Sequence, residues 1–239
     1  MEELVLSAIF QPFLLIIFLP LIYVLIRVYL RKQKFKGSKY NEASGNTYAK
    51  TVGSKGNSGE YLTFSYLEKV EGDKRLFTNI YLPTKDGKTT EIDLLMIHPT
   101  GIYVFESKNY SGWIFGDDKG KYWTQSLKGG KKNRFYNPIW QNAAHINALS
   151  KALGNGYSDF LYSYIVFSER CELNKITITG PGVVVLKRNR LLDQLRVDMT
   201  NRSKVFTKAE MDELEKELSK FHLVDEQMKE AHIQRVAAR

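Results

Sequence analysis

An uncharged run near the start of the chain is the feature that most constrains its fold. The 23 residues from Leu4 to Ile26 include no Asp, Glu, Lys or Arg. As an α-helix this run would be roughly 35 Å long, and the hydrocarbon core of a bilayer is about 30 Å thick. Pro12 and Pro20 would be costly in a soluble helix but are tolerated in membrane spans. The run predicts one transmembrane anchor within residues 1–30.

A cleavable signal peptide is the alternative interpretation of the same run. Such a peptide has a basic start, a shorter apolar region and small residues at its cleavage site. This chain instead starts with Glu2 and Glu3, and the bulky residues Val28, Tyr29 and Leu30 follow its long apolar run. These differences favour the anchor.

The basic residues that follow the run set the expected orientation. Six Lys or Arg residues and no acid lie between Arg27 and Lys39. The positive-inside rule places such a flank in the cytoplasm, together with everything that follows it. We therefore expect a single-pass protein of the cell membrane, with its N-terminus outside and a cytoplasmic soluble domain. The same flank would also attract anionic lipid headgroups.

The net charge of +9 is mostly a signal of this topology, since residues 40–239 carry 29 bases and 24 acids. A hydrophobic fraction of 43% and a charged fraction of 26% exclude a chain that is disordered throughout. The single cysteine, Cys171, excludes an internal disulfide and a zinc site built of cysteines. Residues 31–57 are basic and then rich in Gly, Ser and Asn, which predicts a juxtamembrane segment and linker.

Hydrophobic periodicity and turn signals predict an α/β domain over residues 58–200, with a mixed central sheet flanked by helices. The expected helices cover about 59–70, 138–153 and 190–197, and the expected strands cover 76–82, 91–98, 101–108, 113–115, 122–126, 160–167 and 182–186. Thr207 and Glu210 form a capping-box pattern that opens a final amphipathic helix. Residues 201–239 are therefore expected to be this helix and a polar tail.

Two adjacent strands carry the charged residues that point to chemistry. If the two residues after His98 form a tight hairpin loop, Asp93 lies opposite Glu106. Glu91 then lies opposite Lys108, whereas a register slipped by two residues would place Asp93 opposite Lys108. Both registers put all four charged side chains on one face, because alternate residues of a strand share a face.

Two carboxylates that face each other across a strand pair repel unless something offsets their charge. A hard divalent cation would do so, and it would activate water for the hydrolysis of a phosphodiester. Lys108 could help to orient that water, and Glu60, early on the first helix, could supply a further carboxylate. The alternative is a set of ordinary solvent-facing charges, with Glu91 and Lys108 as a weak cross-strand ion pair.

Four motifs occur in order over about residues 57–165. They are Gly59-Glu60, Glu91-Ile92-Asp93, the segment Gly101–Gly112 and Asn137-Pro138-Ile139-Trp140-Gln141. This series resembles the nuclease-related domain family, NERD, which is similar to the restriction-endonuclease-like superfamily with its PD-(D/E)xK signature. The resemblance implies a restriction-endonuclease-like fold and cleavage of nucleic acid that depends on Mg²⁺ or Mn²⁺. It also implies residue roles: Asp93 and Glu106 as metal ligands, and Lys108, Glu60 and Gln141 as catalytic residues.

Basic and aromatic residues alternate between positions 119 and 140. Cations contact phosphates and rings stack on bases, so the candidate nucleic-acid-binding residues are Lys128, Lys131, Lys132 and Arg134. The alternative is a solvated loop whose aromatic residues pack on the core. His145 lies four residues after Gln141 on one helix face, and we interpret it as a buried, hydrogen-bonded histidine rather than a metal ligand.

The leading hypothesis is a membrane-anchored, metal-dependent nuclease that acts on DNA or RNA, with DNA favoured. The second hypothesis is a non-catalytic module that holds nucleic acid or a protein at the membrane. The expected partners are nucleic acid, the membrane through Leu4–Ile26 and a second copy of the chain in a homodimer.

Overall fold

The computed structural model describes residues 2–84 and 89–222, and within the first helix it describes side chains at Ile16 and from Phe18 onwards. The described helices are α1 (Glu2–Lys36), α2 (Tyr40–Ser44), α3 (Tyr48–Gly53), α4 (Lys55–Leu67), α5 (Pro138–Leu153), α6 (Leu191–Thr200) and α7 (Lys208–Ser219). Two short 3-10 helices cover Asn155–Phe160 and Arg188–Arg190. Thr207 and Glu210 form the predicted capping box at the start of α7.

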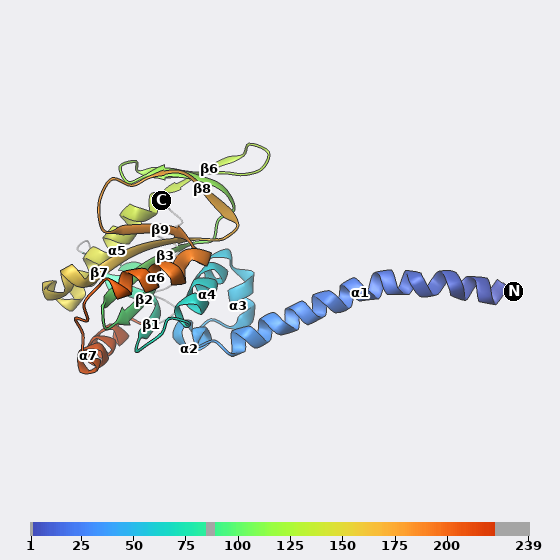
Figure 1. Cartoon of the computed structure of the whole chain (residues 1–239), viewed down its shortest axis with the longest axis horizontal. Coiled ribbons are helices and arrows are strands. Elements are labelled where there is room, and N and C mark those ends of the chain that lie inside the picture. The colour runs from blue at the N-terminus through green and yellow to red at the C-terminus, as the bar shows by residue number, and fades with distance from the viewer. Residues whose placement is uncertain (1, 85–88, 223–239) are drawn as a thin grey trace.

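The central sheet has five strands in the order β1-β2-β3-β7-β9. These strands are β1 (Arg75–Pro83), β2 (Thr89–His98), β3 (Gly101–Lys108), β7 (Leu161–Phe167) and β9 (Val183–Lys187). The sheet is mixed, because β1, β2 and β3 pair antiparallel whereas β3, β7 and β9 pair parallel. Helices flank it, as Figure 1 shows. The predicted fold class, a mixed α/β domain with a central sheet, is confirmed.

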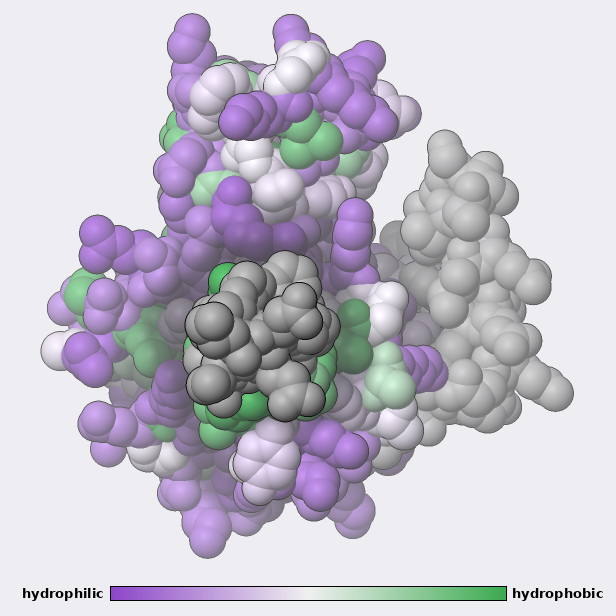
Figure 2. Space-filling model, turned by 90° about the vertical axis from the view of Figure 1, so that its right-hand side faces the viewer, coloured by the Kyte–Doolittle hydropathy of each residue, from purple (hydrophilic) through white to green (hydrophobic). Residues whose placement is uncertain are grey.

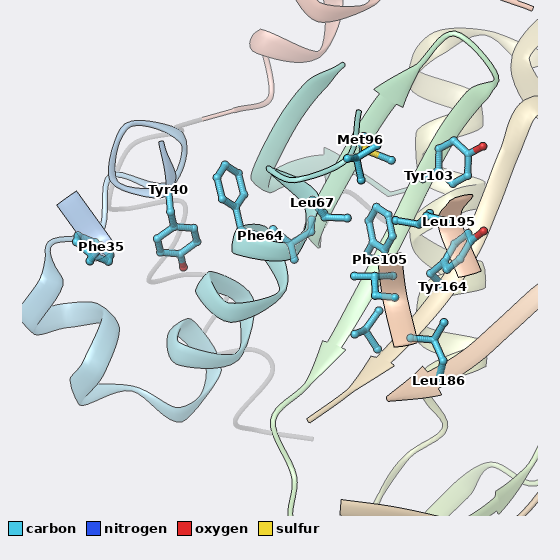
Figure 3. Close-up of a cluster of buried hydrophobic side chains, with 14 residues drawn as sticks. Phe35, Tyr40, Phe64, Leu67, Met96, Tyr103, Phe105, Tyr164, Leu186 and Leu195 are labelled. Atoms are coloured by element: carbon cyan, nitrogen blue, oxygen red, sulfur yellow. The ribbon is translucent and has the colours of Figure 1, made fainter. Parts of the chain in front are cut away.

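Residues of β3 divide the core into two layers, because alternate side chains point to opposite faces of the sheet. Phe105 packs with Phe64 of α4 and Leu195 of α6 on one face, as Figure 3 shows. Val104 belongs to the cluster on the other face, which Leu149 of α5 and residues of α7 complete. Helices α4 and α5 therefore approach β3 from opposite sides.

A second, smaller sheet has the order β6-β5-β4-β8. Its strands are β4 (Gly112–Asp117), β5 (Tyr122–Ser126), β6 (Lys132–Tyr136) and β8 (Cys171–Thr177). Trp123 joins it to the central sheet, since its indole is parallel to the ring of Phe167 with centroids 5.9 Å apart. Gly116 leaves room for this indole, because a Cβ there would come within 2.2 Å of the Trp123 ring.

Residues 31–57, which the sequence predicts as a juxtamembrane segment and linker, are largely helical. The end of α1, helices α2 and α3 and the start of α4 occupy this range. Phe35 and Tyr40 are buried, and their rings lie 5.1 and 5.4 Å from that of Tyr61 on α4. A few aromatic side chains anchor this polar segment to the core, which its overall composition does not indicate.

Helix α1 projects away from the domain (Figure 1). Its large apolar side chains from Ile16 to Leu30 are exposed, by 69% at Ile16 and 46% at Val28. Viewed along α1, hydrophobic residues surround the helix while hydrophilic residues cover most of the domain surface in view (Figure 2). Among the side chains that the structure describes, no helix is long and apolar enough to cross a bilayer. Residues 4–15 and 17 of the predicted span lie outside those side chains.

Candidate active site

The hairpin of β2 and β3 has the predicted tight loop and register. His98 pairs with Gly101, and the antiparallel pairing of β2 with β3 continues to the pair of Leu94 with Phe105. Asp93 and Glu106 are the next residues along each strand, so the register that places them opposite each other is confirmed and the register slipped by two is wrong. The backbone N–H of Ser107 donates to Asp93 Oδ2 at 2.9 Å, which holds the Asp93 carboxylate against β3.

Glu106 is the centre of the site. Its side chain is only 1% exposed, and its Oε1 lies 2.6 Å from Lys108 Nζ. Lys108 Nζ also donates to Gln141 Oε1 on α5 at 3.0 Å. The alternative interpretation as solvent-facing charges is therefore wrong for Glu106, because this side chain is buried. The ammonium group of Lys108 offsets the cost of burying its charge.

The start of α5 positions Gln141 and His145, which lie one turn apart on the face toward β3. The Asn137 side chain accepts a hydrogen bond from Ile139 N, and Pro138 occupies the first helical position, where it fits best. His145 Nε2 lies 3.1 Å from Glu106 Oε2, and its Nδ1 lies 2.7 Å from Thr90 Oγ1. The prediction of a buried, hydrogen-bonded histidine is confirmed.

Glu60 reaches the site from the opposite side, on α4. Tyr40, from the segment predicted as a linker, donates to Glu60 Oε2 at 3.3 Å. Gly59 allows α4 to lie against the residues that follow β3, since a Cβ there would come within 2.7 Å of the Asn109 Cβ. The glycine of the Gly59-Glu60 motif thus explains how α4 brings the Glu60 carboxylate close to the acidic residues of β2 and β3.

Two carboxyl groups of the site are harder to ionise than usual. Desolvation raises the pKa of Glu60 to about 8, and the negative charge of Glu91 adds to the effect. Desolvation also holds the pKa of Asp93 well above its usual range, together with the neighbouring charges of Glu106 and Glu60. Both shifts have the same cause, which is negative charge crowded into a poorly hydrated space.

Glu106 and Lys108 are held in their charged forms. Desolvation opposes the ionisation of Glu106, but the Lys108 ammonium and the hydrogen bond with His145 lower its pKa overall. Desolvation likewise opposes the charge of Lys108, and the carboxylates of Glu106 and Asp93 outweigh it and raise the pKa of the lysine. The site thus contains one firmly formed ion pair beside two carboxyl groups, Glu60 and Asp93, which make no ion pair with the described residues.

The donors of the site fit a hard cation such as Mg²⁺, which binds through one or two carboxylates and keeps several waters. Asp93 Oδ1 accepts no hydrogen bond from the described residues, whereas both Glu106 oxygens have partners. Among the described residues no group of three or more His, Cys, Asp or Glu side chains is placed to hold a metal ion. Each Glu106 oxygen keeps a second lone pair, so a metal bound there would share that oxygen with Lys108 or His145.

The four predicted nucleic-acid-binding residues lie outside this group. Lys128, Lys131, Lys132 and Arg134 are exposed on or beside the β5–β6 hairpin, where the sequence predicts a loop after 126. The alternative interpretation, in which the aromatic residues pack on the core, holds for part of this hairpin. Trp123 packs in the core, while Tyr122 and Tyr136 are exposed.

Sequence reasoning missed two partners of the predicted site residues. The pairing of His145 with Glu106 depends on how α5 packs on β3, and its only sequence signal is the spacing from Gln141. The contact of Tyr40 with Glu60 had no signal, because Tyr40 lies in a polar segment before the recognisable motifs.

Comparisons with known proteins identify a family for the segment that carries this site. Residues 55–168 match the nuclease-related domain, NERD, and this segment includes every site residue from Glu60 to His145. A Bacillus anthracis protein described as uncharacterized is 35% identical over 138 residues, which cover 57% of this chain and 64% of that protein. The match thus spans somewhat less than two thirds of that relative. No solved structure matches the chain.

Proposed function

Since residues 55–168 belong to the nuclease-related domain family, we propose that this protein is a metal-dependent nuclease that hydrolyses phosphodiester bonds in DNA or RNA. The observation that carries the proposal is the ion pair of buried Glu106 with half-buried Lys108, with Asp93 beside it on the next strand. Burying a carboxylate and a lysine two residues apart on one strand is costly, and a catalytic role would account for the cost.

Asp93 and Glu106 would hold Mg²⁺ or Mn²⁺ through their carboxylate oxygens. When bound, such an ion polarises a phosphoryl oxygen and lowers the pKa of water. Lys108 would stabilise the negative charge that develops on the phosphate, and Gln141 would keep the lysine in place through its hydrogen bond. Glu60 suits proton transfer near neutral pH, because a group with a pKa of about 8 both takes up and releases protons there.

The test is cleavage of plasmid DNA, single-stranded DNA and RNA by the purified full chain, with Mg²⁺, Mn²⁺ or EDTA. We expect Asp93→Ala and Lys108→Ala to reduce cleavage by about a hundred-fold or more, as removal of one electrostatic group does in other enzymes. Lys208→Ala, at an exposed position on α7, is the matched control and should cleave normally. Equal cleavage by all variants would identify a contaminating nuclease and contradict the proposal.

A second candidate function is a non-catalytic module that binds nucleic acid or protein. The observation that favours it is the engagement of both Glu106 oxygens by Lys108 and His145, which offsets the charge of this carboxylate without a metal. This function predicts binding without cleavage under any divalent ion. It also predicts that Mg²⁺ and Mn²⁺ leave the melting temperature unchanged, since a ligand that does not bind the folded state cannot stabilise it.

We also propose that α1 anchors the protein in the cell membrane in a single pass, with the domain in the cytoplasm. Its support is the row of exposed apolar side chains from Ile16 to Leu30, because so much apolar surface is unfavourable in water. The basic residues that follow Ile26 favour the stated orientation. Membrane fractions washed with alkaline carbonate should retain the protein, and its release by that wash would contradict an integral anchor.

A further inference from the structure

The outer face of the smaller sheet differs from the rest of the domain surface. Trp123 and Phe135 pair across β5 and β6 and belong to the core cluster beneath the sheet. Their neighbours Tyr122 and Tyr136 also pair, and they point the other way because side chains alternate along a strand. Trp113 of β4 faces outward as well, beside Ser126 of β5.

These outward-facing residues include most of the exposed aromatic side chains of the domain. Outside α1, four aromatic residues in the described part of the chain are classed as exposed: Trp113 at 53%, Tyr122 at 45%, Tyr136 at 44% and Trp140 at 37%. Three lie on the outer face of the smaller sheet, and Trp140 lies at the start of α5. Large rings are usually buried unless they contact a partner, so this clustering indicates a binding surface.

Cations accompany the rings. The Arg134 guanidinium lies 4.9 Å from the centroid of the Tyr122 ring, and Lys121 Nζ lies 5.4 Å from the same centroid. Exposed lysines continue along the hairpin, at positions 128, 131 and 132. Of the acids nearby, Glu172 is paired with Lys187 at 2.8 Å, and the carboxylates of Asp117 and Asp118 accept hydrogen bonds from backbone N–H groups. The surface is therefore complementary to an anion that carries flat apolar groups.

Three of the rings form a run that ends at the start of α5. The Tyr122 and Tyr136 centroids lie 6.4 Å apart, and those of Tyr136 and Trp140 lie 6.3 Å apart. Trp140 directly precedes Gln141, whose side chain holds Lys108. A ligand that extends along these rings would approach the start of α5, the helix that carries Gln141.

We propose that the outer face of the smaller sheet binds single-stranded nucleic acid and guides it to the active site. This inference rests on the proposed nuclease function. Exposed rings stack on unpaired bases, whereas the bases of a duplex are already stacked and covered. Aromatic and basic residues also occur at membrane surfaces, so a membrane is the alternative partner. The position of the face argues against it, because β6 lies at the top of the domain in Figure 1, whereas α1, the proposed anchor, leaves it at the lower right.

Binding can be measured apart from cleavage with the full-length Lys108→Ala protein in EDTA, by fluorescence anisotropy. The probes are a short single-stranded DNA, an RNA of the same sequence, the matching DNA duplex and vesicles of anionic lipid. We expect the single strands to bind at least about ten-fold more tightly than the duplex. We also expect Trp113→Ala and Tyr136→Ala each to weaken single-strand binding by roughly five-fold or more.

Matched variants separate ring contacts from folding defects. Tyr136→Phe keeps the ring and should bind single strands normally. Val197→Ala removes an exposed apolar side chain on α6, away from the sheet, and should also leave binding unchanged. A plot of the logarithm of the binding constant against the logarithm of the salt concentration has a slope that counts phosphate contacts. Arg134→Ala should lower the magnitude of this slope by about one, whereas Arg196→Ala, at an exposed position on α6, should not change it.

Three results would overturn the inference: duplex binding as tight as single-strand binding, unchanged affinity in both ring variants, or vesicle binding that replaces nucleic-acid binding. Cleavage by the wild-type protein together with unchanged binding by the ring variants would leave the nuclease proposal standing and reject this surface. Binding that depends on the rings but without cleavage would reject the nuclease proposal and support the surface.

Discussion

Glu106 of β3 and His145 of α5 meet inside the domain, with 3.1 Å between Glu106 Oε2 and His145 Nε2. Thr90 Oγ1 holds the other nitrogen of the imidazole at 2.7 Å. The carboxylate that we expect to bind metal is therefore held by Lys108 on one oxygen and by His145 on the other. Such contacts fix the orientation of a metal-binding carboxylate and affect its affinity for the ion.

His145→Ala should leave Glu106 Oε2 buried without a partner. We expect this variant to lose roughly 1–3 kcal/mol of unfolding free energy, the usual cost of an unsatisfied buried group. It should also need more Mn²⁺ for half-maximal cleavage, because Glu106 would no longer be held in one orientation. Chemical denaturation and a Mn²⁺ titration of the cleavage rate would measure the two effects. His145→Gln, which retains a donor, should recover part of each, and no recovery would indicate a packing role alone.

Stability should fall as pH rises in the metal-free protein. The pKa of Glu60 is about 8 in the folded state, compared with about 4.5 for an ordinary Glu. Between these values the folded state binds more protons than the unfolded state, so the unfolding free energy decreases as pH rises. The raised pKa of Asp93 acts in the same direction. Melting temperatures measured in EDTA from about pH 5 to pH 8 should show this decline.

Glu60→Gln should flatten the same pH profile, since the amide has no proton to lose. Glu213→Gln, at an exposed position on α7, is the control and should keep the wild-type slope. A Glu60→Gln profile as steep as that of the wild-type protein would show that Glu60 is not the group responsible.

Gly59→Ala should disturb the approach of α4 to β3, because the new Cβ would come within 2.7 Å of the Asn109 Cβ. Overpacking of this kind costs about 1–3 kcal/mol, and here it would also displace the neighbouring Glu60. Gly56→Ala in the same helix meets only ordinary contacts, the nearest at 3.7 Å, and should be neutral or stabilising. Thermal unfolding and cleavage assays of both variants test this difference, and equal behaviour would contradict it.

The folded domain should begin before Tyr40. Phe35 is buried, and its ring contacts those of Tyr40, Tyr48 and Tyr61. A protein that starts at residue 40 should therefore be less stable than one that starts at residue 31, by roughly the 3–5 kcal/mol of a buried Phe lost from a core. Denaturant unfolding of the two truncated proteins would measure the difference, and equal stability would show that Phe35 contributes nothing.

The sequence predicted the parts of the site that depend on local signals. Gly101–Lys108 and Pro138–Leu153 have the predicted bounds, because the first is a run of aliphatic and aromatic residues and the second starts at a proline. The hairpin register followed from the short loop after His98. These signals placed Asp93, Glu106 and Lys108 on adjacent strands before any packing was known.

The rest depended on packing between distant segments. Strands β6 and β8 lie at the two edges of the smaller sheet and contain many polar residues, so their sequences resemble loops. Helices α2 and α3 are short and polar, and the burial of Tyr40 and its neighbours holds them on the domain. The contact of His145 with Glu106 likewise arises only when α5 packs on β3.

A crystal structure of the protein grown with Mn²⁺ would test the central claim most directly. We expect Mn²⁺ to be bound by Asp93 and Glu106 at about 2.0–2.2 Å, the distance typical of small divalent ions and carboxylates. Lys108 and His145 should stay in contact with Glu106, because each carboxylate oxygen keeps a second lone pair for the ion. No ion between these carboxylates at saturating Mn²⁺ would contradict a metal-dependent nuclease.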